Sequence, residues 1–310
     1  MKHLLSIEEL NESDMSRILT LASKVRKKRG ISTALEGETW GLIFTKSSTR
    51  TRVSFQVGIR ELGGESLFLS NNEIQLGRGE SIADTARVLS RFLHGVIIRT
   101  FAQNDLREFA KWGAIPVVNA LTDEEHPCQI LADLFTIGEK RGAAAGKKIA
   151  FIGDGACNVC RSWLFAAAKI GFELAVGAPK GYQPDDETLA RVEKSAGRKS
   201  KFKLTITDDC KEAAKNADVL YTDVWVSMGK EGESAQRMKD LAGYQINAGL
   251  LQTAKKNALV MHCLPAYRGK EIAGEVFEAH SKDIFDQAEN RLHVQKAILT
   301  LLSKQGRKGS

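Results

Sequence analysis

Residues 46–52 read KSSTRTR and form a pattern suited to binding an anion. The motif stands between a predicted strand and the helix after it. The free N–H groups and the dipole of a helix N-terminus favour an anion, and arginine pairs with two phosphate oxygens at once. It is not a Walker loop, because the required glycines are missing. The motif therefore predicts a phosphate site, and a well-capped helix with surface arginines is the alternative.

Arg99 and the motif HPCQ at 126–129 form a second polar group, which follows two later predicted strands. Arginine, a neutral His126 and the Gln129 amide can hold a planar carbonyl group and stabilise charge that develops on its oxygen. The alternative is that His126 simply precedes a helix, because Pro127 suits the first turn of one.

The second half of the chain carries a polar group after each of two further predicted strands. Residues 153–158 read GDGACN and could be mistaken for a dinucleotide loop, but Asn158 stands where that fingerprint needs its third glycine. Asp223 opens the stretch DVWVSMG and could receive an alkylammonium group. The alternative for Ser227, Met228 and Gly229 is an ordinary loop. The polar run 229–237 is long enough to act as a closing lid.

The cysteines and histidines favour neither a metal site nor a cysteine nucleophile. The five cysteines are unpaired in number, which is typical of a reduced, cytosolic protein. Cys157 and Cys160 lack the second pair that zinc requires, so we expect them to pack in the interior. His262 and Cys263 are adjacent in a predicted strand and should point to opposite faces, so we expect no covalent cysteine intermediate. The sequence predicts no metal ion.

Short apolar segments that alternate with helical patterns must position these groups. The expected strands are 40–44, 66–69, 96–98, 115–118, 148–152, 174–176, 203–206, 219–221, 258–261 and 283–286. The expected helices are 49–62, 81–92, 105–112, one that begins at Pro127, 159–170, 186–195, and a final one from about 289 to 302. Such alternation predicts an α/β fold with two doubly wound parallel sheets. Ligands of such sheets bind beyond the carboxyl ends of the strands, where the motifs lie.

Length and composition set the outer limits. The 310 residues predict about two domains, and the small, polar segment 141–148 is the candidate boundary. No apolar stretch approaches the roughly 18 residues that span a bilayer, and the N-terminus lacks a signal-type apolar core, so we expect a cytoplasmic protein without membrane contact. The net charge is +7, but the basic runs 24–29 and 304–308 lack aromatic residues. We therefore expect a solvated helix face and a loose end, not a nucleic-acid site.

Taken together, the motifs resemble the aspartate/ornithine carbamoyltransferase family. The resemblance rests on STRTR at 48–52 followed by HPCQ at 126–129, and it covers essentially the whole chain in order. Residues 74–87 and 119–133 and the pattern DxxxSMG at 223–229 are similar to the ornithine branch. One departure is the single Asn158, where many relatives have two adjacent asparagines.

The resemblance implies transfer of the carbamoyl group from carbamoyl phosphate to the δ-amine of L-ornithine, which gives L-citrulline and phosphate without a cofactor. It implies a carbamoyl phosphate-binding domain at 1–142, an ornithine-binding domain at 143–288, and a helix and tail at 289–310 that return to the first domain. The implied carbamoyl phosphate contacts are Ser48, Thr49, Arg50, Thr51, Gln75, Arg99, His126, Gln129, Cys263, Leu264 and Arg291. The implied ornithine contacts are Asn158, Asp223, Ser227 and Met228. Arg99, His126, Asp223 and Cys263 would be the catalytic residues.

In this family the loop that carries Gln75 reaches into a neighbouring subunit's site, which implies a homotrimer. Three alternatives remain open from the sequence. A carbamoyltransferase for aspartate, putrescine or an N-acylornithine would keep the first-half motifs and change residues 223–229. A nicotinamide oxidoreductase and a non-catalytic protein on the same scaffold are the others.

Overall fold

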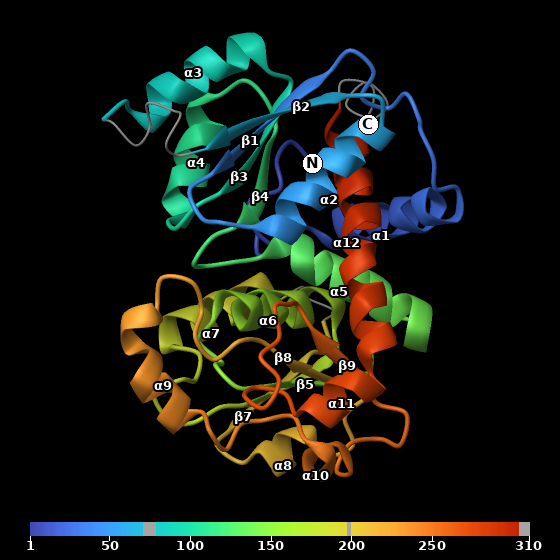
Figure 1. Cartoon of the computed structure of the whole chain (residues 1–310), viewed down its shortest axis with the longest axis vertical. Helices are drawn as coiled ribbons and strands as arrows, with labels where there is room; N and C mark the ends of the chain where they lie inside the picture. The colour runs from blue at the N-terminus through green and yellow to red at the C-terminus, as the bar shows by residue number, and fades with distance from the viewer. Residues whose placement is uncertain (71–78, 197–199, 304–310) are drawn as a thin grey trace. The chain divides into compact units, whose positions relative to one another are not determined.

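The computed structural model describes residues 1–70, 79–196 and 200–303. The chain forms two compact units, the first from residues 1–135 together with those from 290 onward, and the second from residues 136–289. Each unit has one parallel sheet with helices on both faces (Figure 1). The expected fold class is confirmed. Two helices cross the boundaries along the chain, since α5 leads out of the first unit and α12 leads back into it.

The first unit is built on a four-stranded sheet in the order β2-β1-β3-β4. Its strands are β1 (Thr39–Phe44), β2 (Glu65–Ser70), β3 (Gly95–Arg99) and β4 (Val117–Leu121). Its helices are α1 (Glu12–Lys27), α2 (Thr49–Glu61), α3 (Ile82–Phe92) and α4 (Gln103–Trp112), with the start of α5 (Pro127–Arg141) and the end of α12 (Ser281–Leu302).

Burial explains why these segments take these forms. Every residue of the central strand β3 is buried, which suits the apolar run of a parallel strand covered on both faces. Helices α3 and α4 lie on one side of this sheet, and α1 and α2 lie on the other (Figure 1). The Ser81 side chain accepts a hydrogen bond from the Asp84 N–H and caps α3, as its position before the helix predicts.

The second unit is built on a five-stranded parallel sheet in the order β7-β6-β5-β8-β9. Its strands are β5 (Lys148–Ile152), β6 (Glu173–Gly177), β7 (Lys203–Thr207), β8 (Val219–Thr222) and β9 (Leu259–His262). Its helices are α6 (Asn158–Ile170), α7 (Asp186–Ser195), α8 (Cys210–Ala214), α9 (Ser234–Asp240), α10 (Ala248–Leu251) and α11 (Gly274–Ala279).

Both sheets contain a point where the order of the strands reverses. Helices α6 and α7 cover one face of the second sheet, and α8, α10 and α11 cover the other (Figure 1). The reversal falls between β1 and β3 in the first sheet and between β5 and β8 in the second. Ligands of doubly wound sheets bind beyond the carboxyl ends of the strands at such points. The motifs at 46–52 and 153–158 and Asp223 all follow one of these four strands.

One predicted strand is wrong. Residues 283–286 lie inside α12, which therefore begins at Ser281 and not near residue 289. The buried side chains Ile284, Gln287 and Arg291 recur at helical spacing, while Phe285 between them is 54% exposed. The apolar pair Ile284–Phe285 between two aspartates imitates a short strand, because so short a run does not show its period.

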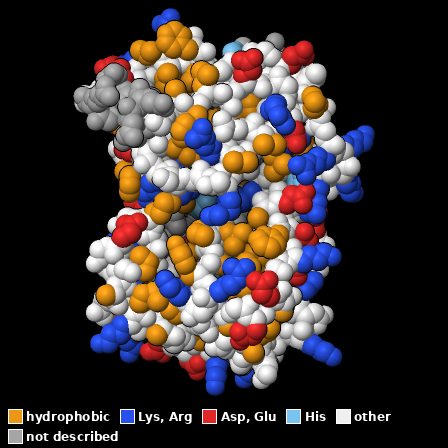
Figure 2. Space-filling view, viewed as in Figure 1, with side chains coloured by type: hydrophobic (Ala, Val, Ile, Leu, Met, Phe, Trp, Pro, Cys, Tyr) orange, Lys and Arg blue, Asp and Glu red, His pale blue; other side chains and the backbone are white. Residues whose placement is uncertain are grey.

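Lys140 holds the first turns of α12. Its ammonium lies 2.9 Å from the Asp283 carboxylate and also pairs with Asp286. Near the start of the chain, the basic run 24–29 overlaps the end of α1, as expected of a helix face. Among the described residues, no helix combines the length and the apolar character needed to cross a bilayer. Basic side chains lie scattered among acidic and hydrophobic ones on the face shown in Figure 2.

Candidate active site

The first candidate centre lies at the carboxyl ends of β1 and β3. The two strands are hydrogen-bonded neighbours, with Phe44 opposite Arg99. Beyond them the Thr45 N–H donates to the Arg99 carbonyl oxygen at 2.9 Å. This pairing brings the loop before α2 beside the end of β3, so the phosphate motif and Arg99 share one edge of the sheet.

The helix α2 begins directly in the phosphate motif. Ser48 has an extended backbone and its hydroxyl accepts a hydrogen bond from the Thr51 N–H at 3.3 Å, so it is the N-cap. The two arginines of the motif differ. Arg52 packs its guanidinium 3.5 Å from the centre of the Phe68 ring and bonds Gln56, whereas Arg50 is exposed. Arg50 is therefore the arginine whose side chain can turn to a bound anion.

A residue from the far end of the chain completes this centre. Arg291 of α12 is buried, and its guanidinium donates to the Thr51 hydroxyl at 2.6 Å across 240 residues of sequence. The return of the C-terminal helix to the first unit thus places a cation at the N-terminus of α2. The same helix also contacts the other end of α2, because Lys296 pairs with Glu61 at 2.8 Å.

His126 is buried beside these cations. Burial lowers the pKa of His126 well below its usual value, and the nearby Arg291 and Arg99 charges lower it further. The loop before it is anchored, because the Glu125 carboxylate accepts a hydrogen bond from the Ile7 N–H at 2.8 Å. The imidazole is consequently neutral at physiological pH and offers one N–H donor and one nitrogen acceptor.

This neutral histidine predicts a pH dependence of stability. The folded protein binds a proton on His126 more weakly than the unfolded chain does. Burial of the neutral imidazole therefore carries no protonation penalty above pH 6.5, and the free energy of unfolding decreases as the pH falls below that value. We expect His126→Asn to lose less stability than the wild type between pH 7 and 5, by up to about 1.4 kcal/mol per pH unit. Thermal midpoints of both proteins measured across that range check it, and parallel curves would contradict it.

Gln129 lies in the first turn of α5, and its backbone N–H donates to the His126 carbonyl oxygen at 3.0 Å. Its side chain is buried, and its Nε2 donates to Asp133 at 2.8 Å. Cys128 between them packs in the interior, where burial raises its pKa to about 12. Gln129 therefore lies beside His126 in the first unit, which also contains Arg99.

The sequence predicts no role of its own for Lys46, although this residue lies within the phosphate motif. Its side chain is 3% exposed, pairs with the Asp123 carboxylate, and lies 4.1 Å from the centre of the Phe101 ring. A lysine at the end of a buried strand is a sequence signal in itself. The partners that hold it come from the loops after β3 and β4, and no local pattern identifies them.

The second candidate centre lies at the carboxyl ends of β5 and β8. Gly153 follows β5 with φ +127°, a conformation that other residues rarely adopt. Cys157 then caps α6 through its sulfur, which accepts from the Cys160 N–H at 3.4 Å, and Asn158 is the first residue of that helix. Both cysteines are buried, so their expected packing in the interior is confirmed, and burial raises the pKa of each thiol well above its usual value.

Asp223 follows β8 and is almost completely buried. Burial raises its pKa, and the nearby His262 and the hydrogen bonds of Cys263 and Val224 lower it in part. The Cys263 sulfur donates to Asp223 Oδ1 at 2.9 Å, and the Val224 N–H donates to the same oxygen at 2.7 Å. In this arrangement Cys263 is a thiol donor to the Asp223 carboxylate, and the absence of a covalent cysteine intermediate stays a prediction.

A hydrogen-bonded histidine holds the turn after β9. His262 Nδ1 accepts from the Leu264 N–H at 2.9 Å, so Nε2 carries the proton and donates to Glu271 at 3.1 Å. Glu271 is fully buried and also accepts from the Tyr267 N–H at 2.5 Å. Leu264 has φ +59°, an uncommon conformation for such a residue. Ligand atoms of Asp223, His262 and Cys263 lie within 4.8 Å of one another, yet both ring nitrogens of His262 already have protein partners.

Removing the Glu271 carboxylate should destabilise the second unit. Glu271→Ala leaves the buried His262 donor and the Tyr267 N–H without their acceptor, which should cost about 3 kcal/mol. Differential scanning of the thermal midpoint checks this, with the exposed Glu275→Ala as the matched control for losing a carboxylate. Equal midpoints for the two variants would refute the role of Glu271.

The remaining predicted residues of this unit lie on the chain after Asp223. Ser227 is half-buried, and Met228 is 42% exposed. The run 229–237 contains a 3₁₀ turn at Glu231–Glu233 and the start of α9. From α9, Arg237 pairs with the buried Asp154 at 2.7 Å and donates to the Trp225 carbonyl at 3.3 Å. These contacts tie the segment to the loop after β5, and its action as a lid stays a prediction.

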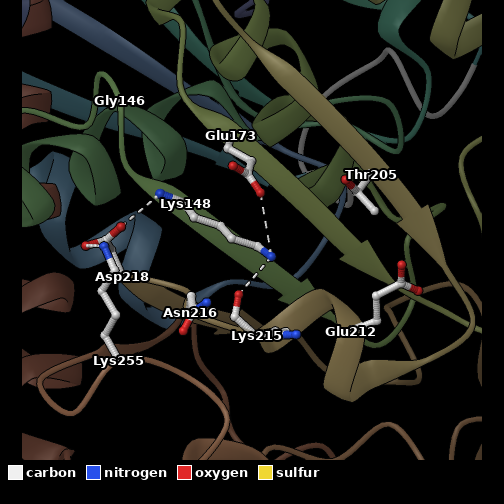
Figure 3. Close-up of a pocket in the computed structure, with 9 residues that line it drawn as sticks. All are labelled: Gly146, Lys148, Glu173, Thr205, Glu212, Lys215, Asn216, Asp218 and Lys255. Carbon is white, nitrogen blue, oxygen red and sulfur yellow. Dashed lines mark hydrogen bonds and ion pairs between the residues drawn. The ribbon is translucent and has the colours of Figure 1, made fainter.

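A polar hollow at the opposite edge of the second sheet is a poorer candidate. Figure 3 shows its lining residues, which come mainly from the amino ends of β5, β6 and β8. Lys148 lies 3.6 Å from the Glu173 carboxylate, and Lys255 lies 2.8 Å from Asp218. Its charges neutralise one another, and ligands of such sheets bind at the carboxyl edge.

Comparison with known proteins gives the same reading for both units. The carbamoyl-P binding domain of aspartate/ornithine carbamoyltransferases matches residues 2–139, and the Asp/Orn binding domain matches residues 145–302. The chain belongs to this family. The protein named ornithine carbamoyltransferase from Syntrophus aciditrophicus is 52% identical over 97% of this chain and 99% of its own. Its counterpart from Methanocorpusculum labreanum is 49% identical over 98% and 99%.

Solved structures of this family agree with the fold. The anabolic ornithine carbamoyltransferase of Campylobacter jejuni is 42% identical, with a TM-score of 0.93 over 98% of this chain and all of the other. That of Pyrococcus furiosus is also 42% identical, with a TM-score of 0.90 over 98% of this chain and 97% of the other. The likeness therefore extends through both units.

The predicted residues divide between the two units. The first unit holds Ser48, Thr49, Arg50, Thr51, Arg99, His126, Gln129 and Arg291. The second unit holds Asn158, Asp223, Ser227, Met228, Cys263 and Leu264. Gln75 lies outside the described residues. Like Lys46, the residues Asp133, Asp154 and Glu271 have no role that the sequence predicts, because their importance appears only through the contacts they make.

Proposed function

We propose that the protein transfers the carbamoyl group of carbamoyl phosphate to the δ-amine of L-ornithine, giving L-citrulline and phosphate, as a step of arginine biosynthesis. The observation that carries the proposal is the buried, neutral His126 beside Arg99 and Arg291, in the unit whose phosphate motif begins α2. The relatives of both units named as ornithine carbamoyltransferases support the choice of amine.

The phosphate of the substrate is assigned to the start of α2. Arg50 supplies a mobile guanidinium, and Ser48, Thr49 and Thr51 supply hydroxyl and backbone donors. These groups neutralise phosphate oxygens and so make phosphate a better leaving group. An anion site in the first unit is consistent with carbamoyl phosphate binding first.

The carbonyl of the substrate is assigned to Arg99, His126, Thr51 and Arg291. Attack by an amine places negative charge on the carbonyl oxygen in a tetrahedral transition state. The neutral imidazole can donate its N–H to that oxygen, while the fixed arginines stabilise the charge. Since these donors are buried, their interaction with the developing charge is stronger than it would be in water.

The amine is assigned to Asp223, with Asn158, Ser227 and Met228 as further ornithine contacts. Burial has raised the pKa of Asp223, and an incoming ammonium group would compensate that buried charge. The δ-amine, with an ordinary pKa of about 10.4, must lose a proton before it attacks. The departing phosphate can accept a proton, so the reaction needs no dedicated protein base. Cys263 and the Leu264 carbonyl oxygen are assigned to the carbamoyl group, without a covalent intermediate.

A citrulline assay with purified protein tests the proposal. Carbamoyl phosphate is supplied with ornithine, N-acetylornithine, putrescine or aspartate in parallel, and the carbamoylated product is measured. We expect turnover with ornithine to exceed that with every other amine. Preference for another amine would leave the family unchanged and reject the ornithine assignment, and no turnover with any amine would reject the reaction.

The proposed assembly is a homotrimer in which the Gln75 loop reaches into the site of a neighbouring subunit. The support for it is the family resemblance of residues 74–87. Sedimentation equilibrium of the purified protein tests it, because a trimer has three times the 34.0 kDa mass of the chain. A monomer that forms citrulline at full rate would reject the trimer as the active unit.

A further inference from the structure

A buried carboxylate in α5 has no part in the chemistry described so far. Asp133 is fully buried, and its Oδ1 accepts a hydrogen bond from Gln129 Nε2 at 2.8 Å. Residues four apart lie on one face of a helix, so the two side chains meet one turn after His126. Asp133 can therefore act on a bound substrate through the Gln129 amide.

This hydrogen bond decides how the Gln129 amide is turned. An ionised carboxylate only accepts hydrogen bonds, and within the amide only the nitrogen donates. The reversed amide would place its oxygen against the Asp133 oxygen, where two acceptors repel. Asp133 therefore holds Nε2 and leaves Gln129 Oε1 on the other side of the group.

The oxygen left over is a buried acceptor. Within the described ranges, Gln129 Oε1 is inaccessible to solvent and receives no hydrogen bond. A buried acceptor without a partner costs about 1–3 kcal/mol, and a ligand that brings an N–H donor removes that cost. The side chains of His126, Arg99 and Arg291 are hydrogen-bond donors and suit a carbonyl oxygen. Gln129 Oε1 is an acceptor, so it selects a group that carries an N–H.

We propose that Asp133 is a positioning residue, which turns the Gln129 amide so that its oxygen accepts a hydrogen bond from the amino group of carbamoyl phosphate. This inference rests on the proposed function. Acetyl phosphate carries a methyl group where carbamoyl phosphate carries the amino group. A fixed acceptor pairs with the amino group but stays unpaired against the methyl group, so Asp133 contributes to the choice of a carbamoyl donor over other acyl phosphates.

Asp133→Asn tests this directly, because it keeps the shape and allows Gln129 to turn either way. The readout is the KM for carbamoyl phosphate beside the Ki of acetyl phosphate as a competitive inhibitor. We expect the KM to rise about tenfold and the Ki to change less than about twofold. A parallel rise of both constants would show a merely structural role, and no change in either would also overturn the proposal.

Gln129→Ala keeps the proposal testable even where Asp133→Asn folds poorly. Gln129→Ala should lower the ratio of the Ki of acetyl phosphate to the KM for carbamoyl phosphate by about tenfold. The double variant with Asp133→Asn should show the same ratio as Gln129→Ala alone. An unchanged ratio in Gln129→Ala, or additive effects in the double variant, would overturn the inference.

Thr85→Val is the control for a buried residue that loses a side-chain hydrogen bond, because the Thr85 hydroxyl donates to Glu80 at 2.8 Å. It should shift the thermal midpoint and leave the ratio as in the wild type, and a ratio changed as in Asp133→Asn would count against the proposal. A wild-type protein that forms no citrulline would reject the proposed function. An active wild type with the ratio unchanged in the Asp133 and Gln129 variants would reject only the role of Asp133.

Discussion

Arg50→Ala is expected to lower kcat/KM for carbamoyl phosphate by about a thousandfold, because it removes the one exposed guanidinium of the phosphate motif. The thermal midpoint should stay as in the wild type, since no buried contact is lost. Steady-state kinetics at saturating ornithine measure the loss, and direct titration with inorganic phosphate reports the same site without turnover.

Arg52→Ala is the matched control for Arg50→Ala, two residues along the same helix. Its guanidinium is engaged by the Phe68 ring and by Gln56, so the variant should lose about 1 kcal/mol of stability and keep its affinity for phosphate. If Arg52→Ala weakened phosphate binding as strongly as Arg50→Ala, the phosphate site would have been assigned to the wrong side chain.

Asp223→Asn is expected to raise the KM for ornithine by about a hundredfold, with a much smaller effect on the KM for carbamoyl phosphate. The amide keeps an oxygen for the Cys263 and Val224 donors but no longer offers a charge to an ammonium group. Initial rates over a matrix of both substrates separate the two effects.

Stability gives a second readout for Asp223. Since its pKa is raised in the folded protein, the ionised carboxylate disfavours folding at neutral pH. Asp223→Asn should therefore have a thermal midpoint at pH 7 that is equal to or higher than that of the wild type. Asp218→Asn is the control at the other end of β8, where the pKa of the carboxylate is lowered and the same change should lower the midpoint. A normal KM for ornithine in Asp223→Asn would contradict the assignment of this residue.

Local patterns predict most of the fold. The buried runs of β1, β3 and β5 and the caps Ser48 and Ser81 are readable without the structure, because their signals lie within a few residues. The strand predicted at residues 283–286 is wrong because a run of four residues is too short to show whether its apolar pattern has the period of a strand or of a helix. Motifs after strands likewise indicate where the candidate centres lie.

Contacts between distant residues are what the sequence does not reveal. Nothing near Thr51 indicates that Arg291 donates to it, and nothing near His262 indicates that Glu271 accepts its hydrogen bond. The difference between Arg50 and Arg52 also depends on the position of Phe68 in the next strand. The sequence therefore predicts which residue types act, whereas tertiary packing decides which individual side chains are available.

The division of the chain has a consequence for its biosynthesis. The first unit is interrupted by residues 136–289 and closed by α12, and Arg291 arrives in that last segment. A chain growing on the ribosome can complete its second unit while the first still lacks its final helix. The Arg291 guanidinium would then be the last part of the proposed carbonyl site that the nascent protein acquires, so a translation product truncated before α12 would lack it.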